Sequence, residues 1–310
     1  MASTASAQRS QGSVPVDLSY SFQQILANAS GDVKYTYPMD LTRGIIPKAI
    51  HSHNDYWRDL PVYTALSVGC ISIEADVWLV NGTLYIGHEL SALQPARTFD
   101  SLYIQPILNI LYRQNPTTRF INGSTTKNGV FDTSSSQILY LFVDLKTDGE
   151  TTWPYVLSAL EPLRSAGYLT TTNGTGITSG PVTIIGTGNT PLEHILNNTH
   201  RDYFYDAPLA TLSQYTNITS LVSPIASTDY EANIGSPNGT TFNATQIDSM
   251  VSQINEAKRR GIAARYWNTP GWPISTRNAV WAKVLELGAG LLNADAVADA
   301  AGFSGTSGNW

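Results

Sequence analysis

The sequence predicts an α/β fold, a TIM (β/α)8 barrel in regular or distorted form, with an active site at the C-terminal mouth of its strands. Short, almost continuously apolar segments alternate with amphipathic helical segments, which is typical of a parallel sheet covered by helices. Polar residues follow several of these strands at their C-terminal ends, where barrel enzymes assemble their sites. The chain of 310 residues has the length of one such barrel. A doubly wound parallel sheet is the alternative.

Eight segments are expected to be the strands. Each is a short apolar run rather than a strict alternation, which indicates a strand buried on both faces. They cover residues 46–50, 70–77, 84–87, 138–145, 182–186, 221–225, 262–267 and 290–293.

Three helices are predicted with the clearest patterns. In residues 246–260 an apolar stripe recurs at helical spacing, with Thr245 as the expected N-cap and Gly261 at the end. Residues 275–287 show a second apolar stripe at helical spacing, which ends at Gly288. Residues 153–166 are predicted to form the third helix.

The domain organisation follows from composition. Residues 21–303 are expected to form a single barrel domain, whereas the Ser/Gln-rich residues 1–20 form a disordered or artificially added tail and residues 304–310 a flexible one. Two polar segments, residues 113–137 and 228–245, are expected to be loops near the mouth.

Charge and composition exclude several classes of function. A formal net charge of −6 argues against a nucleic-acid partner, which a basic face would attract. We find no run of roughly 20 apolar residues, so we expect no membrane span. The single cysteine, Cys70, excludes an intrachain disulfide and is expected to be a buried small residue.

Eight Asn-x-Ser/Thr sequons predict a secreted protein that carries N-glycans. The N-terminus lacks the apolar core of a signal peptide, so we expect that peptide to have been removed or replaced. The sequons begin at Asn28, Asn81, Asn122, Asn173, Asn197, Asn217, Asn238 and Asn243.

Two carboxylates point to the chemistry. Glu74 and Asp76 are two residues apart in a predicted strand, so both side chains project from the same face. Their mutual repulsion can be relieved by a shared proton, a basic partner or one divalent cation, Mg2+ or Ca2+. Asp144 and Lys146 repeat this spacing on a later strand, either as a third metal ligand with a phosphate-binding ammonium or as a structural ion pair.

Histidines follow two of the predicted strands. His53 and His88 would both stand at the rim of the same mouth, where two imidazoles form an acid/base couple. His51 has the same parity as His53 and either orients it or belongs to the site. Asn54 and Arg265 are candidates for binding phosphate oxygens, and Trp267 for stacking on the substrate or for ordinary packing.

The ordered motifs resemble the phospholipase C-like phosphodiesterase superfamily. His53-Asn54-Asp55-Tyr56, residues 74–78 (EADVW) and Gly87-His88-Glu89 are similar to signatures of the altered-inheritance-of-mitochondria type phosphodiesterases, relatives of glycerophosphodiester phosphodiesterases and sphingomyelinase D. The likeness extends from about residue 45 to 303.

This resemblance implies a phosphoric diester hydrolase, or phosphorus-oxygen lyase, on a TIM barrel. Glu74, Asp76 and Asp144 would hold the cation, His53 and His88 would be the catalytic pair, and the substrate would be a small phosphodiester or phospholipid head group, cleaved in some relatives through a cyclic phosphate. The chain departs from glycerophosphodiesterases, which have His-Arg-Gly where His53-Asn54-Asp55 stands and more often Asp where Glu89 stands. Asp55 and Glu89 are therefore possible second-layer residues. A non-catalytic metal-binding barrel and a carboxylate-based glycosidase remain alternatives.

Overall fold

The computed structural model describes residues 18–29, 31–121 and 126–303. The chain divides into two compact units, residues 1–40 and 41–310. In the first unit the described elements are helix α1 (Tyr20–Ala29), which has no buried residue, and the 3-10 turn η1 (Val33–Tyr35). The second unit begins at Leu41, and the predicted domain bounds, residues 21–303, stay a prediction. The predicted tails lie outside the described residues, except for residues 18–20.

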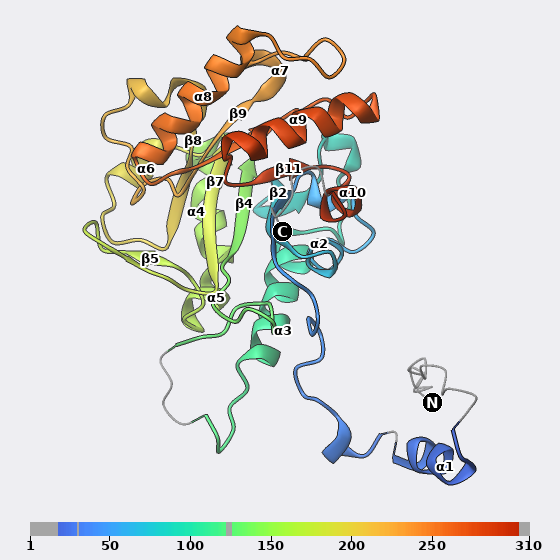
Figure 1. Cartoon of the computed structure of the whole chain (residues 1–310). Helices are drawn as coiled ribbons and strands as arrows, with labels where there is room; N and C mark the ends of the chain where they lie inside the picture. The colour runs from blue at the N-terminus through green and yellow to red at the C-terminus, as the bar shows by residue number, and fades with distance from the viewer. Residues whose placement is uncertain (1–17, 30, 122–125, 304–310) are drawn as a thin grey trace. The chain divides into compact units, whose positions relative to one another are not determined.

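The second unit is built on eight parallel strands that form a nearly closed barrel (Figure 1). Neighbouring strands follow the order β10-β9-β8-β7-β4-β2-β1-β11, and the ring is completed where the N–H groups of Gly290 and Leu291 donate to the Ala264 carbonyl. This confirms the predicted TIM barrel. The strands are β1 (Lys48–Ser52), β2 (Cys70–Val80), β4 (Leu139–Leu145), β7 (Val182–Gly188), β8 (Tyr203–Pro208), β9 (Ile225–Asp229), β10 (Ala263–Trp267) and β11 (Leu292–Ala294).

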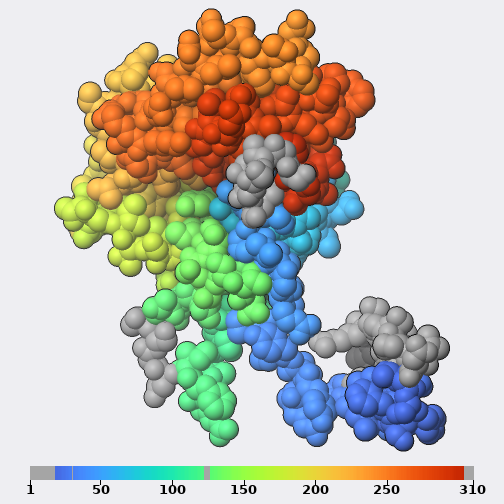
Figure 2. Space-filling view, in the orientation of Figure 1, coloured from blue at the N-terminus to red at the C-terminus, as the bar shows by residue number. Residues whose placement is uncertain are grey.

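Helices lie around the strands, and α8 and α9 pack side by side on one outer face (Figure 2). The α-helices of this unit are α2 (Tyr63–Ser67), α3 (Gln105–Gln114), α4 (Gly149–Ala159), α5 (Glu161–Ser165), α6 (Leu192–Leu196), α7 (Tyr230–Asn233), α8 (Ala244–Arg259), α9 (Ile274–Leu287) and α10 (Val297–Ala301). Short helical turns are η2 (Asp55–Trp57), η3 (Leu90–Ala92), η4 (Asp100–Ile104) and η5 (Leu209–Gln214). A small hairpin joins β5 (Thr171–Thr172) to β6 (Ile177–Thr178).

The three predicted helices exist, with shifted ends. The N-cap of α8 is Asn243 rather than Thr245. The Asn243 side chain accepts from the Gln246 N–H, and the Gln246 side chain accepts from the Asn243 N–H. Gly288 ends α9 in the left-handed conformation that favours glycine. The predicted helix at residues 153–166 is two helices, α4 and α5.

Two strand predictions were wrong. One predicted barrel strand belongs to a hairpin and one barrel strand was not predicted, so the predicted number of eight strands is still correct. β3 (Thr83–Ile86) is not a barrel strand: it pairs antiparallel with the extended end of β2 as a hairpin. The fifth barrel strand, β8, was missed, because its sequence mixes aromatic residues with Asp206 and Pro208 rather than forming an apolar run. The predicted strand at residues 221–225 lies later, as β9.

One of the two predicted mouth loops lies at the other end of the barrel. Residues 113–137 lead from the end of α3 to the start of β4, so the described part of this segment meets the N-terminal ends of the strands. There the Asn115 side chain donates to the Asn128 carbonyl and accepts from the Asn128 N–H, and Thr42 donates to the Val130 carbonyl. Residues 228–245 follow β9 and do belong to the mouth side.

A small apolar cluster fills the barrel beneath the mouth. Phe142 on β4 and Ile185 on β7 are register partners and are fully buried with the rest of the cluster, which comprises Phe204, Ile225 and Leu291. Along β4, the residue two positions after Phe142 is Asp144, so the polar layer lies directly above this apolar floor. The larger core packs between the strands and the helices and includes Cys70, which is buried and free. Among the described helices, none is long and apolar enough to cross a membrane.

Candidate active site

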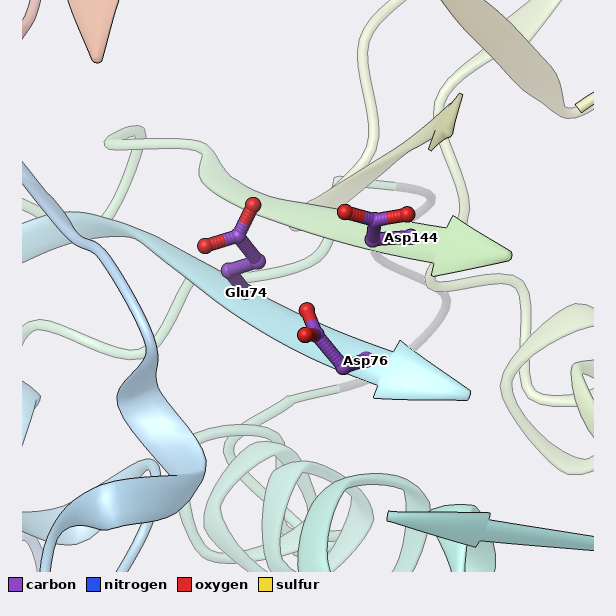
Figure 3. Close-up of side chains that lie close together, drawn as sticks. All are labelled: Glu74, Asp76 and Asp144. Carbon is purple, nitrogen blue, oxygen red and sulfur yellow. The ribbon is translucent and has the colours of Figure 1, made fainter. Parts of the chain in front are cut away.

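Three carboxylates meet at the C-terminal ends of two neighbouring strands. Glu74 and Asp76 project from β2 and Asp144 from β4, where Asp76 and Asp144 are register partners (Figure 3). One oxygen of each carboxylate lies within 4.8 Å of the others, and Glu74 and Asp76 are buried. The period of two along a strand thus brings the predicted ligands together.

One ammonium group partly balances this negative charge. Lys146 Nζ lies 2.8 Å from Asp144 Oδ2 and 3.0 Å from Asp76 Oδ2. Burial, together with the neighbouring Glu74 and Asp144 charges, still raises the pKa of Asp76 to about 7, and burial raises the pKa of Asp144. A single ammonium is therefore not enough to keep the cluster fully ionised.

Glu74 is held in its ionised form on the other side of the cluster. Burial acts to raise its pKa, but His53, His51 and Arg265 outweigh burial and lower it well below the ordinary value. The backbone N–H of Asn54 donates to Glu74 Oε2 over 3.1 Å. Asn54 adopts a left-handed conformation (φ 50°), which Asn tolerates better than most residues.

His53 is oriented by a carboxylate from the last strand. Its Nδ1 lies 3.1 Å from Asp295 Oδ1, and its Nε2 lies 3.7 Å from Glu74 Oε2. Burial acts to lower the pKa of His53, but the charges of Glu74 and Asp295 raise it above 6.5. The Asn54 amide also donates to Asp295 Oδ1, over 3.0 Å, and so fixes that carboxylate.

His88 reaches the same site by a route that the sequence did not indicate. β2 runs beyond the barrel to Val80, and the antiparallel β3 returns the chain to the rim, where the Gly87 N–H donates to the Asp76 carbonyl. His88 Nδ1 then lies 3.5 Å from Asp76 Oδ2. The predicted position of His88 is correct, although the predicted third barrel strand is not what places it there.

A buried tyrosine connects the two sides. The Tyr56 hydroxyl donates to Asp76 Oδ2 over 2.7 Å and lies 3.1 Å from His88 Nδ1, and it also contacts the Asn54 side chain. Tyr56 thus links the Asn54 turn, the carboxylate cluster and His88.

The three carboxylates of the cluster, Lys146, Asn54 and both histidines line one cavity of about 380 Å3. It brings together the predicted acid/base pair, the predicted metal ligands and all four predicted substrate-binding residues. The lining residues are His53, Asn54, Glu74, Asp76, His88, Asp144, Lys146, Thr187, Gly188, Arg265, Trp267 and Asn268.

The three predicted second-layer residues do not line the cavity. His51 is fully buried, with Nδ1 2.7 Å from Ser72 Oγ, and burial together with Arg265 lowers its pKa to about 3. It is therefore a neutral neighbour of Glu74. Asp55 accepts from Ser52 Oγ and the Val62 N–H and so holds the loop after β1, whereas Glu89 is exposed.

Arg265 lies on the floor of the cavity, and two of its three nitrogens form hydrogen bonds. Its Nε donates to Ser227 Oγ over 2.8 Å, its Nη1 donates to Asn293 Oδ1 over 2.9 Å, and the guanidinium stands 4.6 Å from the centre of the Phe142 ring. It is thus a fixed buried cation beneath the site, while Trp267 is part-exposed at the rim.

Sequence reasoning missed two acidic residues and a glycine of this site. Asp295 directly follows the last strand, but its partner His53 lies 242 residues earlier in the chain. Asp206, 3.5 Å from Arg265 Nη2, lies on the unpredicted β8. Gly188, at the end of β7, leaves room for the Asp144 carboxylate, because a Cβ there would lie 2.0 Å from Asp144 Oδ1.

Comparison with known proteins adds an independent observation. Residues 39–206 match the model of the AIM6-like phosphodiesterase domain. The chain is 52% identical to the altered inheritance of mitochondria protein 6 homolog of Arthroderma benhamiae, over 92% of this chain and 93% of that protein. It is 34% identical to altered inheritance of mitochondria protein 6 of Eremothecium gossypii, over 82% and 69%. Among solved structures, phosphatidylinositol-specific phospholipase C from Listeria monocytogenes matches with a TM-score of 0.41 and 10% identity, over 88% of this chain and 100% of that chain.

Proposed function

The chain belongs to the AIM6-like phosphodiesterase family, and on that premise we propose that it is a metal-dependent enzyme that cleaves a phosphodiester by histidine acid/base catalysis. The substrate class is a glycerophosphodiester or the head group of a phospholipid. One observation carries the proposal: two histidines, three carboxylates and a lysine converge on one cavity.

The residues present fit a divalent cation. Three carboxylates with oxygens within 4.8 Å of one another offer the hard oxygen ligands of Mg2+ or Ca2+, and the raised pKa values of Asp76 and Asp144 indicate that positive charge is in short supply there. Glu74, Asp76 and Asp144 would hold the ion. When bound, such an ion supplies Lewis-acid stabilisation of the charge on the phosphoryl oxygens.

The two histidines divide the proton transfers. Asp295 accepts from Nδ1–H of His53, which leaves Nε2 to exchange a proton with the reacting group. His88, on the Asp76 side of the cluster, is the complementary group. One imidazole deprotonates the attacking hydroxyl, which belongs to water or to the substrate itself, and the other protonates the leaving alkoxide. Each transfer contributes roughly 10²–10⁴-fold to the rate.

The remaining lining residues would bind and orient the diester. The Lys146 ammonium, part-exposed at the cavity, is a point charge suited to a phosphate oxygen. Arg265 would act from below as a fixed positive charge rather than as a mobile clamp, since its Nε and Nη1 are hydrogen-bonded to Ser227 and Asn293. Asn54 and Trp267 would contact the group attached to the phosphate.

A phosphodiesterase assay with phosphorus NMR of the products tests the proposal. Wild type is expected to turn over glycerophosphodiester, lysophospholipid or sphingomyelin-type substrates with Mg2+ or Ca2+, and a cyclic phosphate resonance would identify attack by the substrate's own hydroxyl. His53→Ala should lower the rate at least about 100-fold. Full activity in excess chelator would reject the metal site. No turnover of any diester by correctly folded wild type would favour a non-catalytic barrel.

We also propose that the protein is secreted and carries N-glycans. The asparagines of seven sequons are exposed among the described residues, at positions 28, 81, 173, 197, 217, 238 and 243, which supports access by a glycosyltransferase. Protein isolated from its native source should lose mass on enzymatic deglycosylation, and a mass unchanged by that treatment would reject the proposal.

A further inference from the structure

Large apolar side chains stand exposed beside the cavity. Trp272 is 77% exposed, Leu60 63%, Leu90 61% and Trp57 57%. Exposure of apolar area to water is unfavourable in free energy, and a cluster of exposed apolar side chains marks an interaction site. We call the following set the apolar arc: Trp57, Leu60, Leu90, Trp267, Trp272 and Ile274.

The members of the apolar arc lie on one side of the rim. They follow β1, the β2–β3 hairpin and β10, and these strands are neighbours in the barrel with only β11 between β1 and β10. The other part of the rim differs: among the described residues, the loops after β4, β7, β8 and β9 carry no large apolar side chain that is exposed, and the helices that directly follow these loops carry one, Tyr155 on α4. The asymmetry argues against a random scatter of surface residues.

The apolar arc borders the reacting groups. The Trp57 ring lies 5.6 Å from the His88 ring, centre to centre, and Trp267 lines the cavity itself. A surface that contacts the arc is therefore brought against the mouth in which the phosphodiester would react.

The charges of these loops indicate which kind of lipid surface the apolar arc would bind. Residues 268–273, on the β10 side, contain no charged side chain, while Arg58 and Asp59 offset each other beside Trp57. Glu89 precedes Leu90. A face with almost no net positive charge has no electrostatic preference for anionic lipid, whereas indole rings and leucine side chains suit the boundary between head groups and acyl chains.

We propose that the apolar arc docks the mouth of the barrel onto a zwitterionic phospholipid surface. The inference rests on the proposed phosphodiesterase function and narrows it: the substrate is a phosphodiester presented at a lipid interface. Insertion of Trp57, Leu60 and Trp272 among the head groups would hold the cavity at the depth of the lipid phosphates. The attachment is peripheral and is stabilised by burial of apolar area, so it is expected to depend little on salt.

Binding to vesicles tests the docking without any need for turnover. Wild type, Trp57→Ala and Trp272→Ala are sedimented with unilamellar phosphatidylcholine vesicles, in low and in high salt. Each substitution should lower the partition coefficient about 5–20-fold, because part of an indole no longer leaves water. Tyr112→Ala is the matched control: this aromatic side chain is 54% exposed but lies in the last turn of α3, which leads to the opposite end of the barrel. It should bind as wild type does.

A second measurement uses one diester in two forms, dissolved as monomer and packed in vesicles. Trp272→Ala should lower the rate on vesicles about 5–20-fold and leave the rate on monomers unchanged. Absence of wild-type binding to phosphatidylcholine would overturn the inference, as would binding only to anionic vesicles that salt reverses. Self-association lost in Trp272→Ala without any vesicle binding would overturn it in favour of a second copy. Vesicle binding without turnover of any diester would reject the phosphodiesterase proposal while supporting the docking.

Discussion

Asp295 Oδ1 lies 3.1 Å from Nδ1 of His53, although the two residues are 242 positions apart in the chain. β1 and β11 are neighbours in the barrel, so the first and last strands place an imidazole and its orienting carboxylate side by side. This pairing makes the orientation and the pKa of His53 depend on the C-terminal end of the domain.

Asp295→Asn should lower the rate about 10–100-fold, because the amide no longer fixes the Nδ1–H form of His53. Asp295 raises the pKa of His53, so its loss moves that pKa to lower pH. If His53 is the base, the acidic limb of the pH–rate profile moves to lower pH; if it is the acid, the alkaline limb does. The full pH profile of kcat/KM measures this shift, and an unchanged profile would show that Asp295 does not act through His53.

Lys146→Met should make the protein more dependent on a divalent cation. The Lys146 ammonium contacts both Asp76 and Asp144, and without it the carboxylates repel each other with less compensation. Because Lys146 is part-exposed, we expect a loss of about 1–3 kcal/mol in the free energy of unfolding without metal. Added Mg2+ or Ca2+ should restore more stability to the variant than to wild type.

Thermal unfolding in chelator and in excess metal measures this difference. Lys283→Met is the control, since it removes an ion pair to Glu286 on α9, far from the carboxylates in the chain. An equal response to metal in wild type and Lys146→Met would argue that Lys146 does not compete with a cation at this cluster.

Asp206→Asn should stabilise the protein at neutral pH relative to acid pH. Burial raises the pKa of Asp206 from 3.8 to about 6, with Arg265 opposing it. Between these values the folded state binds more protons than the unfolded state, so the wild-type free energy of unfolding falls as pH rises through this window, by up to about 3 kcal/mol. The Asn side chain does not titrate, so the free energy of unfolding of the variant does not fall from this cause between these pH values.

Denaturant unfolding of both proteins at pH 4 and pH 7 provides the comparison. The difference in unfolding free energy, variant minus wild type, should be more positive at pH 7. The opposite sign would mean that the Arg265 charge outweighs the burial of the Asp206 carboxylate.

The carboxylate cluster could be predicted from sequence because its geometry is local. Residues two apart in a strand share a face, so Glu74 with Asp76 and Asp144 with Lys146 needed only a correct strand assignment. Parallel strands that end at one mouth then bring the two pairs together.

The rest of the site depends on pairings between distant parts of the chain. Asp295 and His53 meet only because the barrel closes, and no local pattern shows that closure. Asp206 was hidden in a strand whose aromatic residues, 203–205, were its one strand-like signal. The position of His88 at the rim was predicted correctly, although the strand before it was wrongly predicted to be a barrel strand. A hairpin strand and a barrel strand share the same apolar pattern over four residues, so the sequence does not distinguish them.

Gly188→Ala should weaken cation binding at the proposed metal site by more than the strain of a left-handed backbone explains. Gly188 has φ +61°, and an added Cβ would lie 2.0 Å from Asp144 Oδ1 and 2.8 Å from the Leu145 carbonyl oxygen, so the Asp144 carboxylate must move out of the cluster. Gly239 has the same φ of +61°, and a Cβ there meets nothing within 4 Å. Gly239→Ala therefore carries the same left-handed strain, about 1 kcal/mol, without the clash.

Calorimetric titration of Mg2+ or Ca2+ into the two variants separates the effects. Gly239→Ala should bind as wild type does, whereas Gly188→Ala should bind at least about 10-fold more weakly, since one of three charged ligands is displaced. Far-ultraviolet circular dichroism should show both variants folded. If Gly188→Ala binds the cation with wild-type affinity, Asp144 is not a ligand, and the metal site would have to be built on Glu74 and Asp76 alone.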